Sequence, residues 1–177
     1  MRHRGGVPAR QHAAAGRPPC RARRSRKLRG KAFGGYCAAQ REQCCGWRLH
    51  LSCTTGGVAV AFDLVPGGRH DRTPSHELAY GLPAGAAVYG DKGYNAGDDE
   101  ASIADESGVR LVPIRKANTR PNLWAEKLAL RAWRKRIEVL FSQLEAMGVQ
   151  RLRARANPGL QRKLHAALLA AVITNAD

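Results

Sequence analysis

Two acidic residues in this sequence stand where they could hold a metal ion. Asp91 directly follows residues 86–90, a short apolar run that is typical of a buried strand. In open α/β sheets, ligands gather outside the carboxyl ends of strands, and Gly90 and Gly93 leave room for one there. An aspartate at such a place also commonly caps a loop by accepting backbone N–H groups. Position alone therefore leaves a ligand role and a capping role open.

Glu138 lies in a long predicted helix, one residue after Ile137 and so about 100° round from its apolar stripe. By itself it could form an ordinary ion pair with Arg134, four residues earlier, worth about 0.3–0.5 kcal/mol. The two acids together indicate more, because Mg²⁺ prefers carboxylate and phosphate oxygens. Phosphodiester chemistry commonly uses two such ions. Two carboxylates rarely hold both, so a third is expected.

The elements around these acids follow from hydrophobic periodicity. Residues 47–53 alternate apolar and polar side chains, which predicts a half-buried strand with His50 on the surface. Residues 58–65 are continuously apolar and predict a strand buried on both faces. Further strands are expected at residues 86–91 and 109–114, and helices from Thr73 or Ser75 to Leu82, from Asn95 or Asp98 to near Gly108, and over about 123–146 and 158–174. A hairpin followed by alternating strands and helices predicts an α/β fold with a mixed sheet.

Charge and cysteine content limit the class of protein. The chain has 30 Lys and Arg against 14 Asp and Glu, a net charge of +16, which favours a nucleic-acid partner over a merely basic soluble protein. Residues 1–31 have almost no large apolar side chain and are expected to form a disordered basic arm, leaving 32–177 as the domain. Five cysteines without paired spacing predict reduced thiols in the cytoplasm, and no apolar run is long enough to span a membrane.

Four motifs in order carry a resemblance to a known family. The stretches "GWRLHL", "PGGRHD", "YGDKGY" and "RKRIEVLFSQL" resemble the catalytic domain of bacterial insertion-sequence DDE transposases, over roughly residues 28 to 175. The resemblance implies a ribonuclease H-like mixed sheet flanked by helices. It also implies two aspartates and a glutamate that bind two Mg²⁺ or Mn²⁺ ions to cleave and join DNA. Asp91 matches the second aspartate, Glu138 the glutamate and Arg134 the arginine four residues before it.

Three departures from the family pattern bear on activity. Arg131 stands where the family usually has tyrosine, and Glu145 where it usually has lysine. The family's first aspartate lies on a strand before "GWRLHL", but residues 1–62 contain no aspartate and only one acid, Glu42. The first strand is therefore expected to be missing or degraded. We hypothesise a truncated or frameshifted remnant, which translation of the other upstream reading frames tests.

The basic residues near these motifs are candidate DNA contacts. They could neutralise phosphates, or they could form an ordinary solvated surface: Lys92, Arg115, Lys116, Arg134, Lys135 and Arg136. Trp124 and Trp133 could stack on a base, although the position of Trp133 on the apolar stripe favours core packing. His70 and Asp71 match a recurring loop of the family, whose role we expect to be structural.

The leading interpretation is an incomplete DDE transposase domain that binds DNA, expected as a homodimer by the resemblance, with little or no strand transfer. The alternatives are a non-catalytic basic nucleic-acid-binding protein, in which both acids are structural, and a gene remnant that barely folds.

Overall fold

The computed structural model describes residues 6–12, 31–37, 42–70, 72–152, 154 and 156–175. The chain divides into two compact units. The first comprises Met1–Gln11, His50–Asp63 and Asp71–Leu140, and the second His12–Leu49, Leu64–His70 and Phe141–Asp177.

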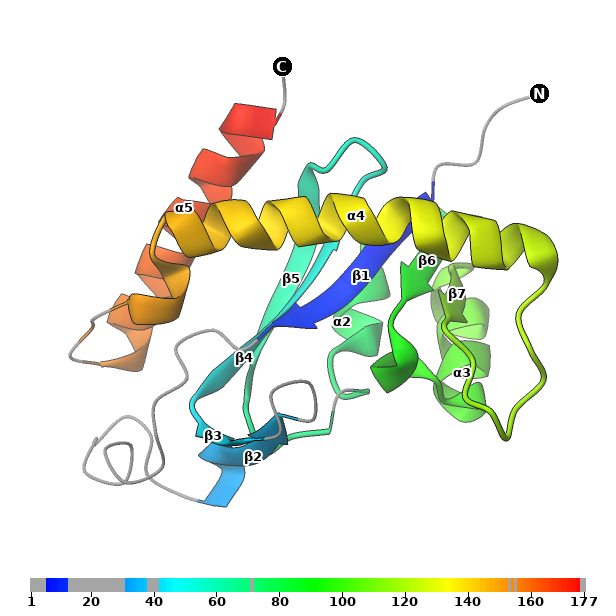
Figure 1. Cartoon of the computed structure of the whole chain (residues 1–177), viewed down its shortest axis with the longest axis horizontal. Helices are drawn as coiled ribbons and strands as arrows, with labels where there is room; N and C mark the ends of the chain where they lie inside the picture. Colours follow the sequence, from blue (N-terminus) through cyan, green and yellow to red (C-terminus); the bar gives the residue numbers. More distant parts are fainter. Residues whose placement is uncertain are drawn as a thin grey trace. The chain divides into compact units, whose positions relative to one another are not determined.

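A five-stranded sheet has the order β5-β4-β1-β6-β7 (Figure 1). Its strands are β1 (Gly6–His12), β4 (Trp47–Cys53), β5 (Ala59–Pro66), β6 (Ala87–Gly90) and β7 (Arg110–Pro113). The parallel pairs are β1 with β6 and β6 with β7, while a tight turn, in which Thr54 N donates to Val58 O at 2.8 Å, joins β4 to β5. The predicted α/β class is confirmed.

The expectation of a missing first strand is wrong. Gly6–His12 form β1, between β4 and β6, within the segment assigned to a disordered arm. The prediction failed because it asked for large apolar side chains, whereas β1 is held by parallel backbone pairing, Val7 with Val88 and Ala9 with Gly90. The rest of the predicted arm, residues 1–5 and 13–30, lies outside the described residues.

The burial of the two hairpin strands is the reverse of the prediction. His50, expected on the surface, is fully buried together with Ser52 on the same face of β4. Leu51, on the other face, is fully buried as well. Strand β5, expected to be buried on both faces, leaves Val60 and Phe62 45% and 37% exposed. The reason is strand order, because β4 has a neighbour on each side whereas β5 is the edge. Local periodicity cannot show which strand of a hairpin lies at the edge.

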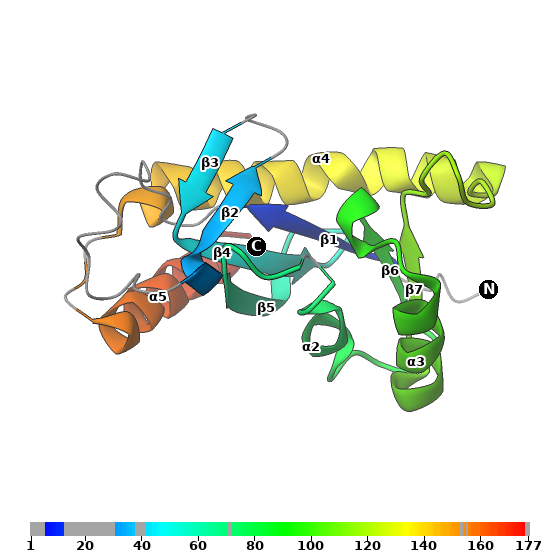
Figure 2. The same cartoon turned by 90° about the horizontal axis from the view of Figure 1, so that it is seen from below.

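Helices cover both faces of the sheet within the first unit. Figure 2 shows α4 (Trp124–Ala146) on one side and α2 (Ser75–Ala79) with α3 (Gly97–Ser107) on the other. The core beneath α2 and α3 includes Leu78, Val88, Tyr94, Ile103 and Val109. The expected C-terminal glycine of α3 is confirmed, since Gly108 has φ 67° and its N–H donates to Ala104 O.

Burial within the sheet also changes the acidity of a cysteine thiol. Cys53 is a free thiol within β4, and its burial raises its pKa to about 12. The Cys53 thiol is therefore neutral and unreactive at ordinary pH.

The second unit is organised around close backbone contacts between glycines. It contains η2 (Lys31–Phe33), the antiparallel hairpin of β2 (Gly34–Cys37) and β3 (Glu42–Cys45), η4 (Val149–Arg151) and α5 (Asn157–Asn175). The loop after β5 packs on this hairpin: Gly67 N donates to Gly46 O and Gly68 N to Ala32 O, each at 2.8 Å. A Cβ on Gly68 would meet backbone, lying 2.7 Å from Ala32 O and closer still to Gly34 O. The second glycine of "PGG" is thus required because a side chain there would collide with backbone oxygens.

We expect Gly68→Ala to lower the free energy of unfolding by about 1–3 kcal/mol, because the clashing atoms are backbone and cannot rotate away. Gly97→Ala is the matched control, since its Cβ would meet nothing within 4 Å. Urea unfolding followed by circular dichroism measures both. Equal stability of the two variants would contradict the proposed close packing.

Candidate functional site

Asp91 lies at the carboxyl end of β6, as its sequence position predicts. It is the N-cap of η3 (Lys92–Tyr94), and its Oδ1 accepts a hydrogen bond from Lys92 N at 2.9 Å. The side chain is half-buried. The capping role therefore exists, and it engages one of the two carboxylate oxygens.

A buried pair of side chains fixes the turn that carries Asp91. The Tyr94 hydroxyl lies 2.8 Å from His50 Nδ1, and the rings of these two residues meet edge to face with centroids 6.0 Å apart. A Cβ on Gly90 would stand 3.2 Å from the Tyr94 ring, so glycine lets the ring close over the strand end. Sequence reasoning missed His50 because its pattern assigned it to the surface.

Glu138 is held on α4 by the arginine that precedes it by one helical turn. Arg134 Nε donates to Glu138 Oε1 at 3.0 Å, the ion pair that helical spacing predicted. The pKa of Arg134 is raised, chiefly by this hydrogen bond, and the negative charges of Asp91 and Glu138 both contribute. Since Coulomb interactions fall off with distance, the Arg134 guanidinium lies near both carboxylates. Asp91 and Glu138 therefore both lie within electrostatic range of one cation, the Arg134 guanidinium.

This donor set does not fit the pair of divalent ions that the sequence resemblance implies. Among the residues that the structure describes, no three His, Cys, Asp or Glu side chains gather as a metal site. Strand β1 supplies no acid: after the pair Ala9 and Gly90, the next residues along the two strands are Arg10 and Asp91. Asp71 lies outside the described residues. Two carboxylates beside an arginine carry too little negative charge for two divalent cations.

The predicted DNA contacts separate into two groups. Lys92, Lys116, Lys135 and Arg136 are exposed, and Arg134 is exposed but paired with Glu138. Arg115 is different, because its two terminal nitrogens donate to both Glu100 oxygens at 2.6 and 2.7 Å. Its side chain is only 28% exposed, and the pairing with Glu100 raises its pKa. Its guanidinium is thus engaged within the fold, which gives Arg115 a structural role, and its contact with DNA stays a prediction.

The outer face of α4 carries Trp124, which was predicted to stack on a base, and two basic side chains that the contact prediction did not include. Trp124 is 75% exposed, and Lys127 and Arg131 are exposed on the same side of the helix. Trp133 is half-buried, in keeping with its position on the apolar stripe. This face could have been predicted from the sequence, because Trp124, Lys127, Arg131 and Lys135 follow one another at spacings of three and four residues.

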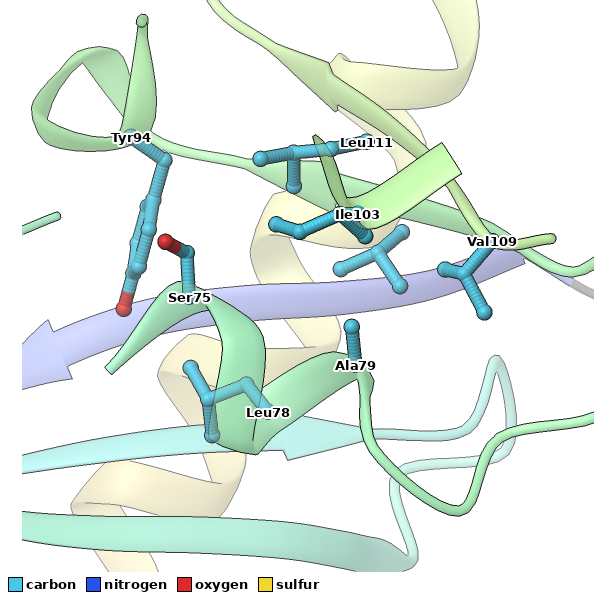
Figure 3. Close-up of a pocket in the computed structure, with 8 residues that line it drawn as sticks. Ser75, Leu78, Ala79, Tyr94, Ile103, Val109 and Leu111 are labelled. Carbon is cyan, nitrogen blue, oxygen red and sulfur yellow. The ribbon is translucent and has the colours of Figure 1, made fainter. Parts of the chain in front are cut away.

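A small, partly open hollow in the first unit has the size and lining of a packing gap. Figure 3 shows Leu78, Ile103, Val109 and Leu111 around it, with Tyr94 at one side. Its interior is almost entirely apolar and about the size of one water molecule. It is a packing gap in the core, and no ligand chemistry is assigned to it.

Comparison with known proteins decides the family. The family model "Transposase DDE domain" matches residues 10–173, which is nearly the whole chain. The chain belongs to this family. Its function is therefore related to DNA transposition, and the family implies DNA as its partner. No curated protein and no solved structure matches it significantly. In the described part of this transposase domain, no helix is long and apolar enough to cross a membrane.

The role of Arg115 can be tested by stability. Arg115→Ala removes a two-fold hydrogen-bonded ion pair from a half-buried site, so we expect unfolding free energy to fall by about 1–3 kcal/mol. Lys116→Ala, at an exposed neighbour, is expected to change it by less than about 0.5 kcal/mol. Urea titration of both variants measures the difference. An unchanged stability for Arg115→Ala would contradict the structural role of its pair with Glu100.

Proposed function

We propose that this chain is a DNA-binding transposase domain whose metal centre is incomplete. The observation that carries the proposal is the composition of the site: Asp91 and Glu138 stand beside Arg134, and β1 offers no third carboxylate. The strand order, with β1 central and parallel to β6, supports a ribonuclease H-like fold. In an intact relative, the resemblance implies two ions that activate water and then a 3′-hydroxyl for joining.

DNA binding is proposed to rest on exposed basic side chains of the first unit. Lys92 begins η3 after β6, Lys116 comes from the loop after β7, and Lys135 and Arg136 lie on α4. Each phosphate neutralised releases condensed counterions, which drives association and makes it depend on salt. The net charge of +16 adds long-range attraction to any polyanion. We further propose, from the family alone, that the protein assembles as a dimer on DNA.

The non-catalytic alternative keeps a specific observation in its favour. Asp91 accepts the Lys92 N–H and Glu138 accepts the Arg134 Nε–H, so both acids have structural roles as they stand. In that case the acids would serve folding only. In the incomplete-transposase proposal they also hold one divalent ion weakly, which separates the two experimentally.

DNA affinity is expected to fall steeply with salt and to be unaffected by EDTA. For Lys135→Ala with Arg136→Ala, we expect the slope of log affinity against log salt to flatten by about 2, at about 0.9 per lost phosphate contact. Arg110→Ala is the matched control, because Arg110 is paired with Glu126 at 3.0 Å. Fluorescence anisotropy with a labelled duplex measures the slopes. Identical slopes in all three proteins would contradict the proposed contacts.

Purified protein is expected to leave supercoiled plasmid uncut in Mg²⁺ or Mn²⁺, because the carboxylates present cannot balance two ions. Gel electrophoresis of the plasmid is the measurement. Ion-dependent cutting that Asp91→Asn abolishes would overturn the proposal of an incomplete centre. Weak Mn²⁺ binding that is lost in Asp91→Ala and Glu138→Ala supports it over the non-catalytic alternative. If Asp91→Ala and Glu138→Ala both bind Mn²⁺ as the wild type does, the non-catalytic alternative is favoured.

A further inference from the structure

The solvent-facing side of α4 combines apolar and basic side chains in one line. Trp124 and Leu128 are 75% and 45% exposed, and Arg131 and Lys135 are also exposed. Their spacings of four, three and four residues place them on one face of the helix. The opposite face, with Ile137 and Leu140 fully buried, packs on the core. This face is therefore left outside the packing of the first unit.

An exposed tryptophan of this kind has no packing role in the unit that contains it. Burying such a side chain removes a large apolar area from water, so the fold forgoes a substantial stabilisation at Trp124. Leu128 lies one helical turn further on and extends the apolar area. Arg131 and Lys135, which continue the line, indicate an anionic partner. Trp124 and Leu128 indicate that this partner also presents apolar, planar groups.

We propose that this face of α4, from Trp124 to Lys135, binds an unpaired segment of DNA, with Trp124 stacked on a base and Arg131 and Lys135 on phosphates. The inference rests on the proposed DNA-binding function and adds the form of DNA recognised. A duplex turns its charged backbone outward and keeps its bases stacked inside, so it offers nothing to an aromatic ring on a helix surface. A single strand exposes base faces and phosphates together, and aromatic and basic side chains in series recognise it.

The dimensions and position of the face agree with such a ligand. Eleven residues of α-helix span about 16 Å, which accommodates a few nucleotides. The line leads along α4 toward Glu138, which lies three residues beyond Lys135. Lys116 and Arg120, both exposed in the loop that precedes α4, extend the positive charge beyond Trp124 at the other end. An unpaired strand on this face would therefore run toward the Asp91 and Glu138 locality.

The test compares a fluorescein-labelled 12-nucleotide single strand with the duplex of the same sequence. We expect the single strand to bind wild-type protein more tightly than the duplex. Trp124→Ala should weaken single-strand binding by roughly fivefold to a hundredfold while changing duplex affinity less than about twofold. Trp124→Phe should restore most of the affinity and Trp124→Leu should not, because only an aromatic ring stacks. Single-strand binding should also quench tryptophan fluorescence in the wild type but not in Trp124→Ala.

Tyr80→Ala is the matched control, since Tyr80 is an aromatic residue 82% exposed on another element of the same unit. It should bind both forms as the wild type does. The inference would be overturned if Trp124→Ala weakened duplex and single-strand binding equally, or if it affected neither form. Restoration of single-strand affinity by Trp124→Leu would also overturn it. None of these results would contradict the proposed DNA-binding function. A change in dimer formation without a change in single-strand affinity would assign the face to a second copy. Failure of wild-type protein to bind either form would instead overturn the proposed function.

Discussion

The balance of charge at the end of β6 is the feature on which the functional interpretation depends. Asp91 and Glu138 come from elements far apart in the sequence, and both act on one guanidinium, that of Arg134. One guanidinium offsets only part of the negative charge of the two carboxylates, and Arg134 supplies this offset from within the chain. A pair of divalent ions would need more negative charge than these groups provide, and the neighbouring position on β1 carries arginine.

The surrounding fold explains why this site keeps its shape. The hydrogen-bonded pair of His50 and Tyr94 anchors the turn after β6 to β4, and the small Gly90 lets that turn close. On the other side of the sheet, the buried stripe of α4 fixes the rotation of the helix. Fixing the rotation places Glu138 and Trp124, which are fourteen residues and so about 40° apart around the helix, on the same side of α4, away from the buried stripe. In the function that we propose, a transposase domain with an incomplete metal centre would thus retain an ordered surface for DNA.

Much of the fold could be predicted from periodicity, but the burial of particular strands could not. The stripe of Ile137 and Leu140 specified α4, and the Asp91 and Arg134 motifs located the candidate site. The first strand was missed because its small and polar residues do not resemble a buried strand, and its place depends on pairing with a distant partner, β6. His50 was misassigned for a related reason, since sheet order decides whether the second face of β4 is covered. The structural role of Arg115 could not be predicted because its partner, Glu100, lies on a separate helix.

The most direct test of an incomplete metal centre is to restore the absent charge. A Mn²⁺ titration, followed by electron paramagnetic resonance, should compare wild-type protein with Arg10→Asp, which adds a carboxylate to β1 one residue beyond Ala9, the partner of Gly90 in the register of β1 and β6. Arg162→Asp, an equal change of charge on α5, is the control. We expect weak binding of at most one ion by the wild type and the control, and at least tenfold tighter binding by Arg10→Asp. Tight binding of two ions by the wild type would contradict an incomplete metal centre. So would a Mn²⁺ affinity of Arg10→Asp no higher than that of the control.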